Sequence, residues 1–332
     1  MTISAKVVAD SISEAGVRLI TLQLRYPKFI HGEFMTHRVF SRNASSSRAV
    51  PVERLIRDVL DDLVYPSHWG KNQQGMQAAT EVDELELMEF NRAETYESNA
   101  EEPESFFRKI TRTEAWDYAR WDAIHAARAF HVAGYHKQIV NRLLEPFCHI
   151  NVVCTSTEWS NFFALRCHPD AQPEMRLLAE AMRDAIAAST PRKLAAGSWH
   201  LPYVGDDEWR NWPQDLVEGG DGYSGDECMA NLIKLSVARC ARVSYLTQEG
   251  KKPNVDEDLK LYDRLVGSVP LHASPAEHQA TPDAVRSNQD VGYYHKSWQK
   301  PELHGNLVGW VQYRKILERW EWSDGKAQVG TK

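Results

Sequence analysis

The sequence lacks several features that would assign it to a familiar class at once. It contains no P-loop pattern (GxxxxGKS or GxxxxGKT) and no GxSxG nucleophile motif, so neither of those two sites is indicated. No run of about 18 apolar residues occurs, and no basic-then-apolar leader opens the chain. We therefore expect a globular protein without a membrane partner.

Positive charge and cysteine are also scarce. The chain has 39 Lys and Arg against 46 Asp and Glu, a net charge of −7, so no overall basic field draws it to nucleic acid. The five cysteines form no CxxC pair, and a reducing cytoplasm is the expected location. A hydrophobic share of 42% in 332 residues is ordinary for an enzyme with one or two domains.

One segment, Thr36–Arg48, is unusually polar. It holds three arginines, four serines and a histidine in thirteen residues, and we call it the Arg/Ser segment. Guanidinium groups and hydroxyls satisfy phosphate oxygens and base edges. The segment follows a strand-like run, so the sequence predicts a pocket for an anionic, planar ligand on a rigid support.

Periodicity predicts a mixed α/β fold. Alternation of apolar residues predicts a strand over 17–25, and β character recurs over 148–157. Spacings of three and four residues predict helices over 51–64, 83–98, 112–144, 171–187 and 255–267. Residues 65–80 resemble a polar loop, and 194–231 a long connection, with order returning at 232–245.

Single residues in this sequence have ordinary explanations as well as functional ones. Arg48, Arg142 and Arg166 could each be solvated or paired at the surface. His272 and His278 beside Glu277 match no zinc spacing, so no metal site is expected. Aromatic and polar residues alternate just before Arg166, which suits a flat ligand that needs stacking and hydrogen bonds.

Three blocks together resemble the flavin-dependent thymidylate synthase (ThyX) family. The Arg/Ser segment matches the family pattern RHRxxSxNxxSxR, with Thr36 in place of the first arginine. The second block comprises Arg142 before Leu-Leu-Glu-Pro, NFFALR at 161–166 and AQPEMR at 171–176. The third comprises ARVSY at 241–245 and HASPAEH at 272–278. Ala44 and Ala49 also depart from the residues that are common in the family.

The order of these blocks differs from that of the family, in which the third block comes first. We interpret the chain as a circular permutation. Residues 1–193 and 232–282 would form one interleaved catalytic domain, 194–231 a long connection and 283–332 a C-terminal extension. The resemblance implies a central, mostly antiparallel twisted sheet flanked by long helices.

The resemblance also implies an activity and its site. The chain would bind FAD, use methylenetetrahydrofolate and NADPH as co-substrates, convert dUMP to dTMP, and assemble as a homotetramer. The residues implied at the reacting centre are Arg166, His272 and Ser46, with no serine attacking the substrate. Those implied for the flavin are His37, Arg38, Val39, Asn161, Ser244, Ser274 and Glu277. Those implied for the substrate are Glu33, Ser46, Ser47, Arg48, Arg142 and Arg166.

Three alternatives remain open at this stage. The same scaffold could place another one-carbon group, such as hydroxymethyl, on dUMP or dCMP; the changes at Thr36, Ala44 and Ala49 motivate this alternative. The chain could be an inactive nucleotide-binding homologue. It could bind nucleic acid through the Arg/Ser segment, which the acidic net charge disfavours.

Overall fold

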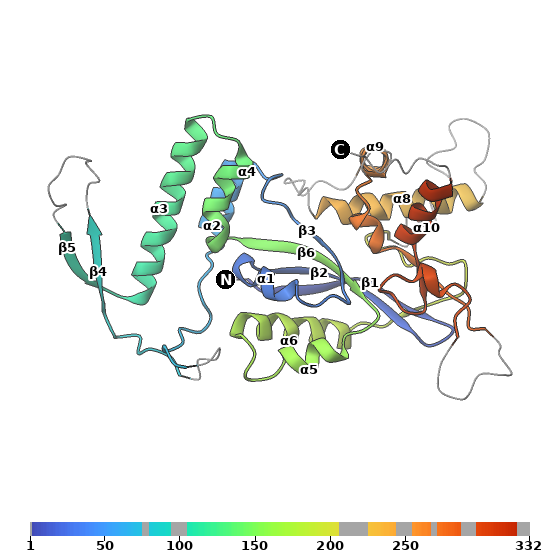
Figure 1. Ribbon diagram of the computed structural model, residues 1–332, viewed down its shortest axis with the longest axis horizontal. Coiled ribbons are helices and arrows are strands. Elements are labelled where there is room, and N and C mark those ends of the chain that lie inside the picture. The colour runs from blue at the N-terminus through green and yellow to red at the C-terminus, as the bar shows by residue number, and fades with distance from the viewer. Residues whose placement is uncertain are drawn as a thin grey trace.

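A five-stranded sheet forms the centre of the protein (Figure 1). The computed structural model describes residues 2–74, 80–93, 105–205, 225–243, 254–266, 271–286 and 297–323. The strands, in spatial order, are β3 (Ser41–Ala44), β6 (His149–Ser156), β2 (Arg18–Pro27), β1 (Ser4–Ser13) and β7 (Arg192–Leu194). All neighbours pair antiparallel except β1 and β7. The expected α/β class with a mostly antiparallel sheet is confirmed.

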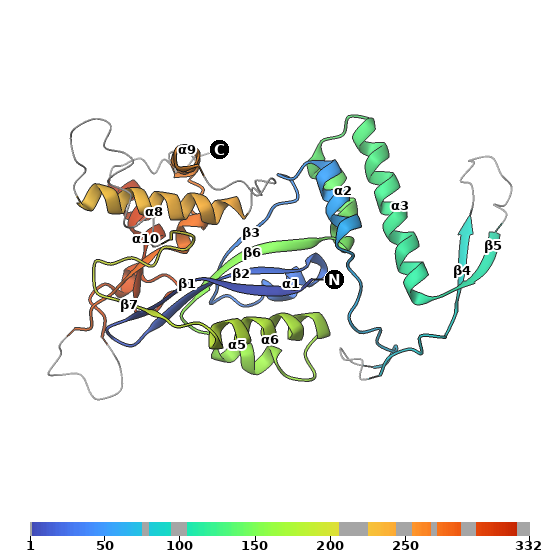
Figure 2. The same cartoon turned by 180° about the vertical axis from the view of Figure 1, so that it is seen from behind.

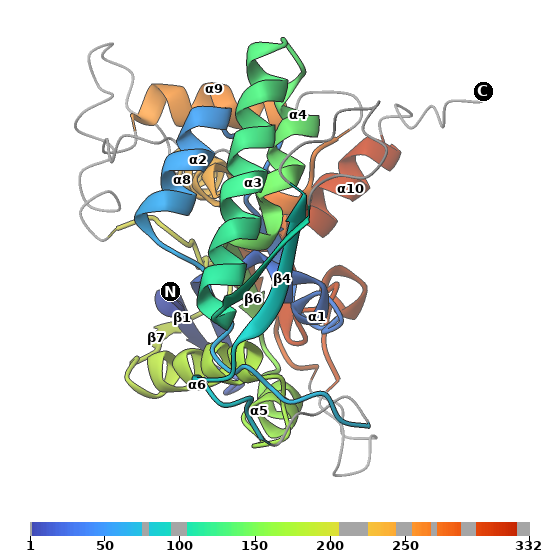
Figure 3. The ribbon, with the colours of Figure 1, turned by 90° about the vertical axis from the view of Figure 1, so that its left-hand side faces the viewer.

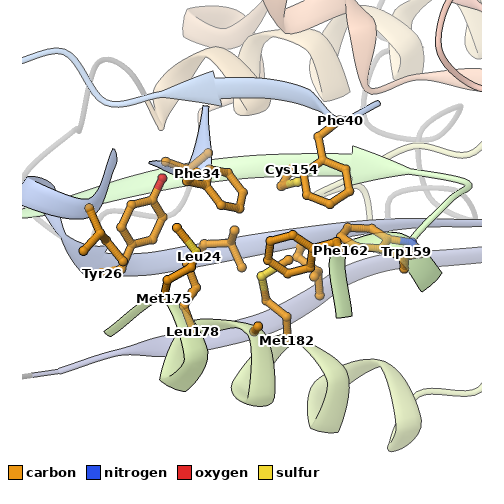
Figure 4. Packing of buried hydrophobic residues seen from close by; sticks show 14 of the residues in the cluster. Leu24, Tyr26, Phe34, Phe40, Cys154, Trp159, Phe162, Met175, Leu178 and Met182 are labelled. Carbon is orange, nitrogen blue, oxygen red and sulfur yellow. The ribbon is translucent and has the colours of Figure 1, made fainter. Parts of the chain in front are cut away.

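One face of the sheet is covered by two helices, α5 (Ser160–Arg166) and α6 (Pro173–Ala187). The predicted alternation of β2 sends Ile20, Leu22 and Leu24 to this face, where they pack with residues of α6 (Figure 4). Each of these side chains is almost completely buried, which stabilises the fold by about 1.5–3 kcal/mol per residue. The core thus fixes the register of the strand that leads to the Arg/Ser segment.

The other face of the sheet is covered by elements from late in the chain (Figures 1 and 2). They are α8 (Gly225–Arg242), α9 (Val255–Val266), the 3-10 turns η3 (Ser274–Glu277) and η4 (Pro301–Leu303), the pair β8 (Ala280–Pro282) and β9 (Trp310–Gln312), and α10 (Tyr313–Ser323). Val153 of β6 packs against Cys240 and Val243, and η3 contacts β3 directly. The third sequence block therefore lies against the strand of the first.

A helical arm stands at one end of the sheet (Figures 1 and 3). Its elements are α2 (Val52–Asp61), α3 (Arg112–Val132), α4 (Lys137–Val140) and the 3-10 segment η2 (Asn141–Phe147). The arm has its own core, which includes Ile56, Ile124 and Leu144. Beyond α3 lies the hairpin of β4 (Met88–Ala93) and β5 (Ser105–Ile110).

Two predicted helices are wrong or only partly right. The helix over 83–98 is wrong, because β4 occupies its centre; residues 94–98 lie outside the described part. The helix over 112–144 begins correctly, at a capping box between Thr111 and Glu114. It ends at Val132, since Gly134 takes a φ of +84°, a conformation typical of glycine after a helix. Arg142 consequently lies on η2 instead of near the end of a long helix.

Most of the other predicted elements are present. The helices over 51–64, 171–187 and 255–267 are confirmed as α2, α6 and α9, and the β region over 148–157 as β6. Order resumes earlier than expected, because α8 already begins at Gly225. Residues 206–224 of the long connection lie outside the described part. None of the described helices is long and apolar enough to span a bilayer, and all five cysteines are free.

Candidate active site

The Arg/Ser segment starts as a tight turn, continues as the edge strand β3 and ends in a second turn. The short helix α1 (His31–Phe34) precedes it, and the Thr36 hydroxyl donates to the Glu33 carbonyl oxygen at 2.7 Å. His37 and Phe40 are buried, whereas Arg38 and Val39 are exposed. The apolar core thus holds the segment in place while its arginine side chain reaches the surface.

His37 is the point at which the first and second blocks meet. Its imidazole stands edge-on to Phe162 of α5, with ring centroids 4.8 Å apart, and its Nε2 accepts a hydrogen bond of 3.0 Å from Nε of Arg166. This bond requires Nε2 to be unprotonated. Burial lowers the pKa of His37, and the positive charges of Arg166 and Arg42 lower it further, so the imidazole is neutral at pH 7 and orients the Arg166 guanidinium.

A cleft of about 410 Å³ opens beside the Arg/Ser segment. The residues that line it come from three distant parts of the chain: Arg38, Phe40, Arg42, Glu277, Gly305, Asn306, Gln312, Arg314 and Lys315. Four basic side chains therefore face one carboxylate. Such a lining favours an anionic ligand, and the almost completely buried ring of Phe40 lies beneath it. The sequence predicted Arg38 and Glu277 at one site, and both line this cleft.

The far end of the Arg/Ser segment docks on the helical arm. The buried Asn141 side chain donates to the carbonyl oxygens of Ser47 (2.6 Å) and Val50 (2.9 Å), and the Lys137 ammonium donates to the Ala49 carbonyl at 3.0 Å. These bonds satisfy backbone carbonyl groups of a turn that lies outside the described strands. The turn carries the exposed side chain of Arg48.

A carboxylate links this turn to Arg142. Glu145 accepts hydrogen bonds from the Ser47 hydroxyl at 2.9 Å and from the Lys28 ammonium at 2.5 Å. Burial raises the pKa of Glu145, but these two hydrogen bonds and the charges of Lys28 and Arg142 outweigh it and lower the pKa. Ser47 and Arg142 thus share one ionised neighbour, Glu145, and Arg142 is exposed.

Several predicted site residues have no such connection. Ser46 accepts a backbone hydrogen bond from Arg48 (3.3 Å), which gives it a role in the turn. His272, Ser274 and Asn161 have exposed side chains. Val39 uses its carbonyl oxygen to accept from Asn306 at 2.9 Å, and the exposed Glu33 uses its own to accept from Thr36. Ser244 lies outside the described residues. The roles of all these residues stay predictions.

Sequence reasoning missed part of the cleft. Asn306, Gln312, Arg314 and Lys315 lie in the extension, more than 250 residues from the Arg/Ser segment, and no motif marks them. Arg42 belongs to the Arg/Ser segment, four residues after Arg38. This position was a signal from which its place at the cleft could have been predicted. No group of three His, Cys, Asp or Glu side chains suitable for a metal ion occurs in the residues that the structure describes.

Comparison with known proteins gives one family and several distant structures. The family model described as "Thymidylate synthase complementing protein" matches residues 17–192. No curated protein matches. A UMP/dUMP methylase, PolB, from Streptomyces cacaoi bound with 5-Br UMP is 17% identical over 56% of this chain and 89% of its own, with a TM-score of 0.36.

A second structure of PolB, bound with 5-Br dUMP, is 16% identical over 56% of this chain and 90% of its own, again with a TM-score of 0.36. The flavin-dependent thymidylate synthase ThyX from Helicobacter pylori, complexed with FAD and dUMP, is 17% identical over 51% of this chain and 67% of its own, with a TM-score of 0.31.

Proposed function

Because the chain belongs to the thymidylate synthase complementing protein family, we propose that it transfers a one-carbon group to carbon 5 of a pyrimidine deoxynucleotide monophosphate. The reaction we propose is the conversion of dUMP to dTMP, with FAD as cofactor and methylenetetrahydrofolate and NADPH as co-substrates. One observation carries the proposal: Arg166 is bound to His37 of the Arg/Ser segment, while Arg38 and Arg42 of the same segment line a cleft with Glu277.

The residues of the cleft suit a flavin dinucleotide. Arg38 and Arg42 provide guanidinium donors for phosphate oxygens, and the almost completely buried ring of Phe40 lies beneath the lining. Bound FAD would supply the hydride that NADPH delivers to it. His37 would hold Arg166 in one orientation next to the flavin, and Val39, Asn161, Ser244 and Ser274 remain candidates for further contacts.

The docked turn at the other end of the segment suits the phosphate of the nucleotide. Arg48 and Arg142 would grip it, assisted by Ser46 and Ser47, because two guanidinium groups and hydroxyl donors match its oxygens. Glu145 holds the Ser47 hydroxyl in place. Arg166 would stabilise the negative charge that develops on the pyrimidine as carbon 5 becomes nucleophilic. His272 and Glu33 are proposed only by family resemblance.

We also propose the permuted arrangement and the interleaved domain. In support, η3 contacts β3, and the Asn43 side chain on β3 donates to the Cys240 carbonyl of α8 at 2.7 Å. These contacts join residues 1–193 to 232–282. The segment after residue 283 is joined to the same body, since β9 pairs with β8.

A direct assay tests the proposed function. The purified protein is first examined for a flavin absorption band, then incubated with dUMP or dCMP, methylenetetrahydrofolate and NADPH, and the nucleotide is weighed by mass spectrometry. A net gain of one carbon and two hydrogens on dUMP is the expected result. An additional oxygen would identify hydroxymethyl transfer instead. A protein that stays colourless with added FAD and leaves both nucleotides unchanged would contradict the proposal.

A further inference from the structure

The residues after 300 are built into the wall of the cationic cleft. Asn306 donates to the Val39 carbonyl at 2.9 Å and accepts from the Ser41 hydroxyl at 3.0 Å. Gln312 is 2% exposed, and its amide donates to the Ser41 hydroxyl, the Glu277 carbonyl and Asn306. These bonds tie the extension to the Arg/Ser segment and to η3 at one place.

The backbone of this wall is specified just as closely. Gly305 has a φ of +57°, and a Cβ there would lie 2.6 Å from the Gln312 side-chain oxygen. Any other residue would therefore meet both backbone strain and a clash with a buried amide whose nitrogen is hydrogen-bonded. The turn that precedes β9 thus holds Gln312, and with it the start of α10, in one position.

The first turn of α10 places two cations at the cleft. Arg314 pairs with Glu277 and with Glu318, and Lys315 pairs with Glu318 at 2.7 Å. Two positive charges of the extension are balanced in this way by two carboxylates. Arg38 and Arg42, in contrast, have no ion-pair partner within the part of the chain that the structure describes. The cleft therefore has a surplus of about two positive charges, which matches a diphosphate.

We propose that the segment Gly305–Lys315 forms one wall of a phosphate-binding site, in which Arg314 and Lys315 complete the cationic cleft begun by Arg38 and Arg42. The ligand is a phosphate or diphosphate group of a nucleotide. We favour the diphosphate of FAD as this ligand, because the phosphate of the pyrimidine nucleotide is assigned to the turn at Arg48. This choice rests on the proposed function. The extension is then part of the binding machinery.

Binding measurements on the full chain test this inference. Titration calorimetry compares FAD, inorganic pyrophosphate, riboflavin and dUMP for the wild type and for Arg314→Gln, Lys315→Gln and Arg314→Lys. We expect each Gln variant to weaken FAD and pyrophosphate binding about tenfold, the value of one charge-assisted hydrogen bond. Riboflavin, which lacks phosphate, should bind equally, and Arg314→Lys should keep most of the affinity because it keeps the charge.

Controls separate a binding role from a structural one. Arg183→Gln removes an exposed arginine of α6 that pairs with its neighbour Asp184, and should change no affinity. Arg314→Gln also removes the partner of Glu277, so its thermal midpoint must be compared with that of the wild type. If it unfolds, Lys315→Gln still decides, since Lys315 makes no ion pair with Glu277.

The outcomes distinguish this inference from the proposed function. FAD binding that is unchanged in both Gln variants overturns the phosphate site and leaves the flavin function standing. A wild type that binds pyrophosphate but not FAD, with weaker binding in the variants, supports the phosphate site and contradicts the flavin function. Weakening of dUMP alone supports the site with the monophosphate as its source. A wild type that binds none of the phosphate-bearing probes overturns the inference.

Discussion

Arg166 is the residue on which the proposed chemistry depends most. Its Nε is hydrogen-bonded to His37, so a substitution to Ala removes a positive charge from the substrate site that we propose. We expect Arg166→Ala to lower kcat about 100- to 1,000-fold, the effect of removing one preorganised charge stabiliser. Arg166→Lys should restore little, because an ammonium cannot keep the same fork of donors.

Steady-state kinetics and a thermal melt check this prediction together. The thermal midpoint should stay close to that of the wild type, and Arg183→Ala serves as the matched surface control. Activity in Arg166→Ala that equals the wild type would remove the role assigned to this residue.

Arg48 should behave differently from Arg166. Its side chain is exposed on the turn held by Asn141, where it would contact the substrate phosphate in the ground state and the transition state alike. We expect Arg48→Ala to raise KM for the nucleotide about tenfold with a smaller change in kcat. A kcat defect with an unchanged KM would contradict a role in phosphate binding.

A buried chain of polar side chains makes stability depend on pH. The Thr21 hydroxyl contacts His200 and Thr155 at 2.8 and 2.7 Å, and Thr155 contacts His278 at 2.8 Å. Burial lowers the pKa of both His200 and His278 to about 3. The unfolded chain binds these protons near pH 6.5, so acidification below that value favours unfolding. These two histidines leave the free energy of unfolding unaffected above pH 6.5. Between pH 6.5 and pH 3 each of them lowers it by at most about 1.4 kcal/mol per pH unit.

Urea unfolding at pH 7.5 and pH 5 measures this effect. Carboxylates such as Glu145 also lose stabilising charge in acid, so a variant is needed to isolate the histidine contribution. His278→Asn keeps an atom in reach of Thr155 but cannot titrate, and it should reduce the loss of stability between the two pH values. His125→Asn, an exposed histidine of α3, should leave that loss unchanged. Equal losses in the wild type and His278→Asn would refute this account.

At the scale of elements, the turn after β3 depends on one amide. Asn141 is completely buried and donates to two carbonyl oxygens, those of Ser47 and Val50. Asn141→Ala should lower the free energy of unfolding by about 2–3 kcal/mol, because one buried and one partly buried carbonyl lose their donor. It should also weaken nucleotide binding, since the turn carries Arg48.

Chemical denaturation and nucleotide titration of the same samples check this prediction. Gln138→Ala removes an exposed amide three residues away on α4 and should change neither property. If Asn141→Ala were as stable as the wild type but bound nucleotide poorly, the stability of the turn would come from other contacts than those of Asn141, such as the bond from Lys137 to the Ala49 carbonyl.

Sequence reasoning succeeded where an element's own pattern decides its structure. The alternation in β2 and the amphipathic spacing in α6 follow from which side chains must be buried, and both were predicted. The failures have local causes. Over 88–91, the apolar Met88 and Phe90 alternate with the polar Glu89 and Asn91, a period of two that fits the strand β4 better than a helix. Gly134 within an otherwise helical pattern ended α3.

The site was predictable only in part, for a different reason. Motif residues such as His37, Arg38, Arg166 and Glu277 could be named from the sequence, and the structure brings His37 to Arg166 and Arg38 to Glu277. Arg314 could not be named, because its position depends on how β9 pairs with β8. Long-range pairing of this kind leaves no local pattern in the sequence.

At the scale of the whole molecule, the helical arm leaves an apolar surface uncovered. Trp121 and Phe130 of α3, Tyr135, Ile139 of α4 and Leu143 of η2 are each 37–52% exposed, and the rings of Phe130 and Tyr135 lie 4.9 Å apart. Exposed aromatic side chains that lie together, as Phe130 and Tyr135 do, are typical of an interface between protein chains. This surface fits the homotetramer that the resemblance to the ThyX family implies, with a second copy of the chain as its partner.

A charged residue on this surface should separate the subunits. We expect Phe130→Glu to reduce the mass measured by light scattering after size-exclusion chromatography, because a buried, unpaired carboxylate destabilises an interface. The isolated chain should keep its circular dichroism spectrum, since the Phe130 side chain is 39% exposed within one chain. Leu177→Glu, which places the same charge at an exposed position of α6, should leave the mass unchanged. An oligomer of unchanged mass in Phe130→Glu would place the subunit contacts elsewhere. A monomeric wild type would show that there are none. In either case the exposed apolar residues of the arm would need another explanation.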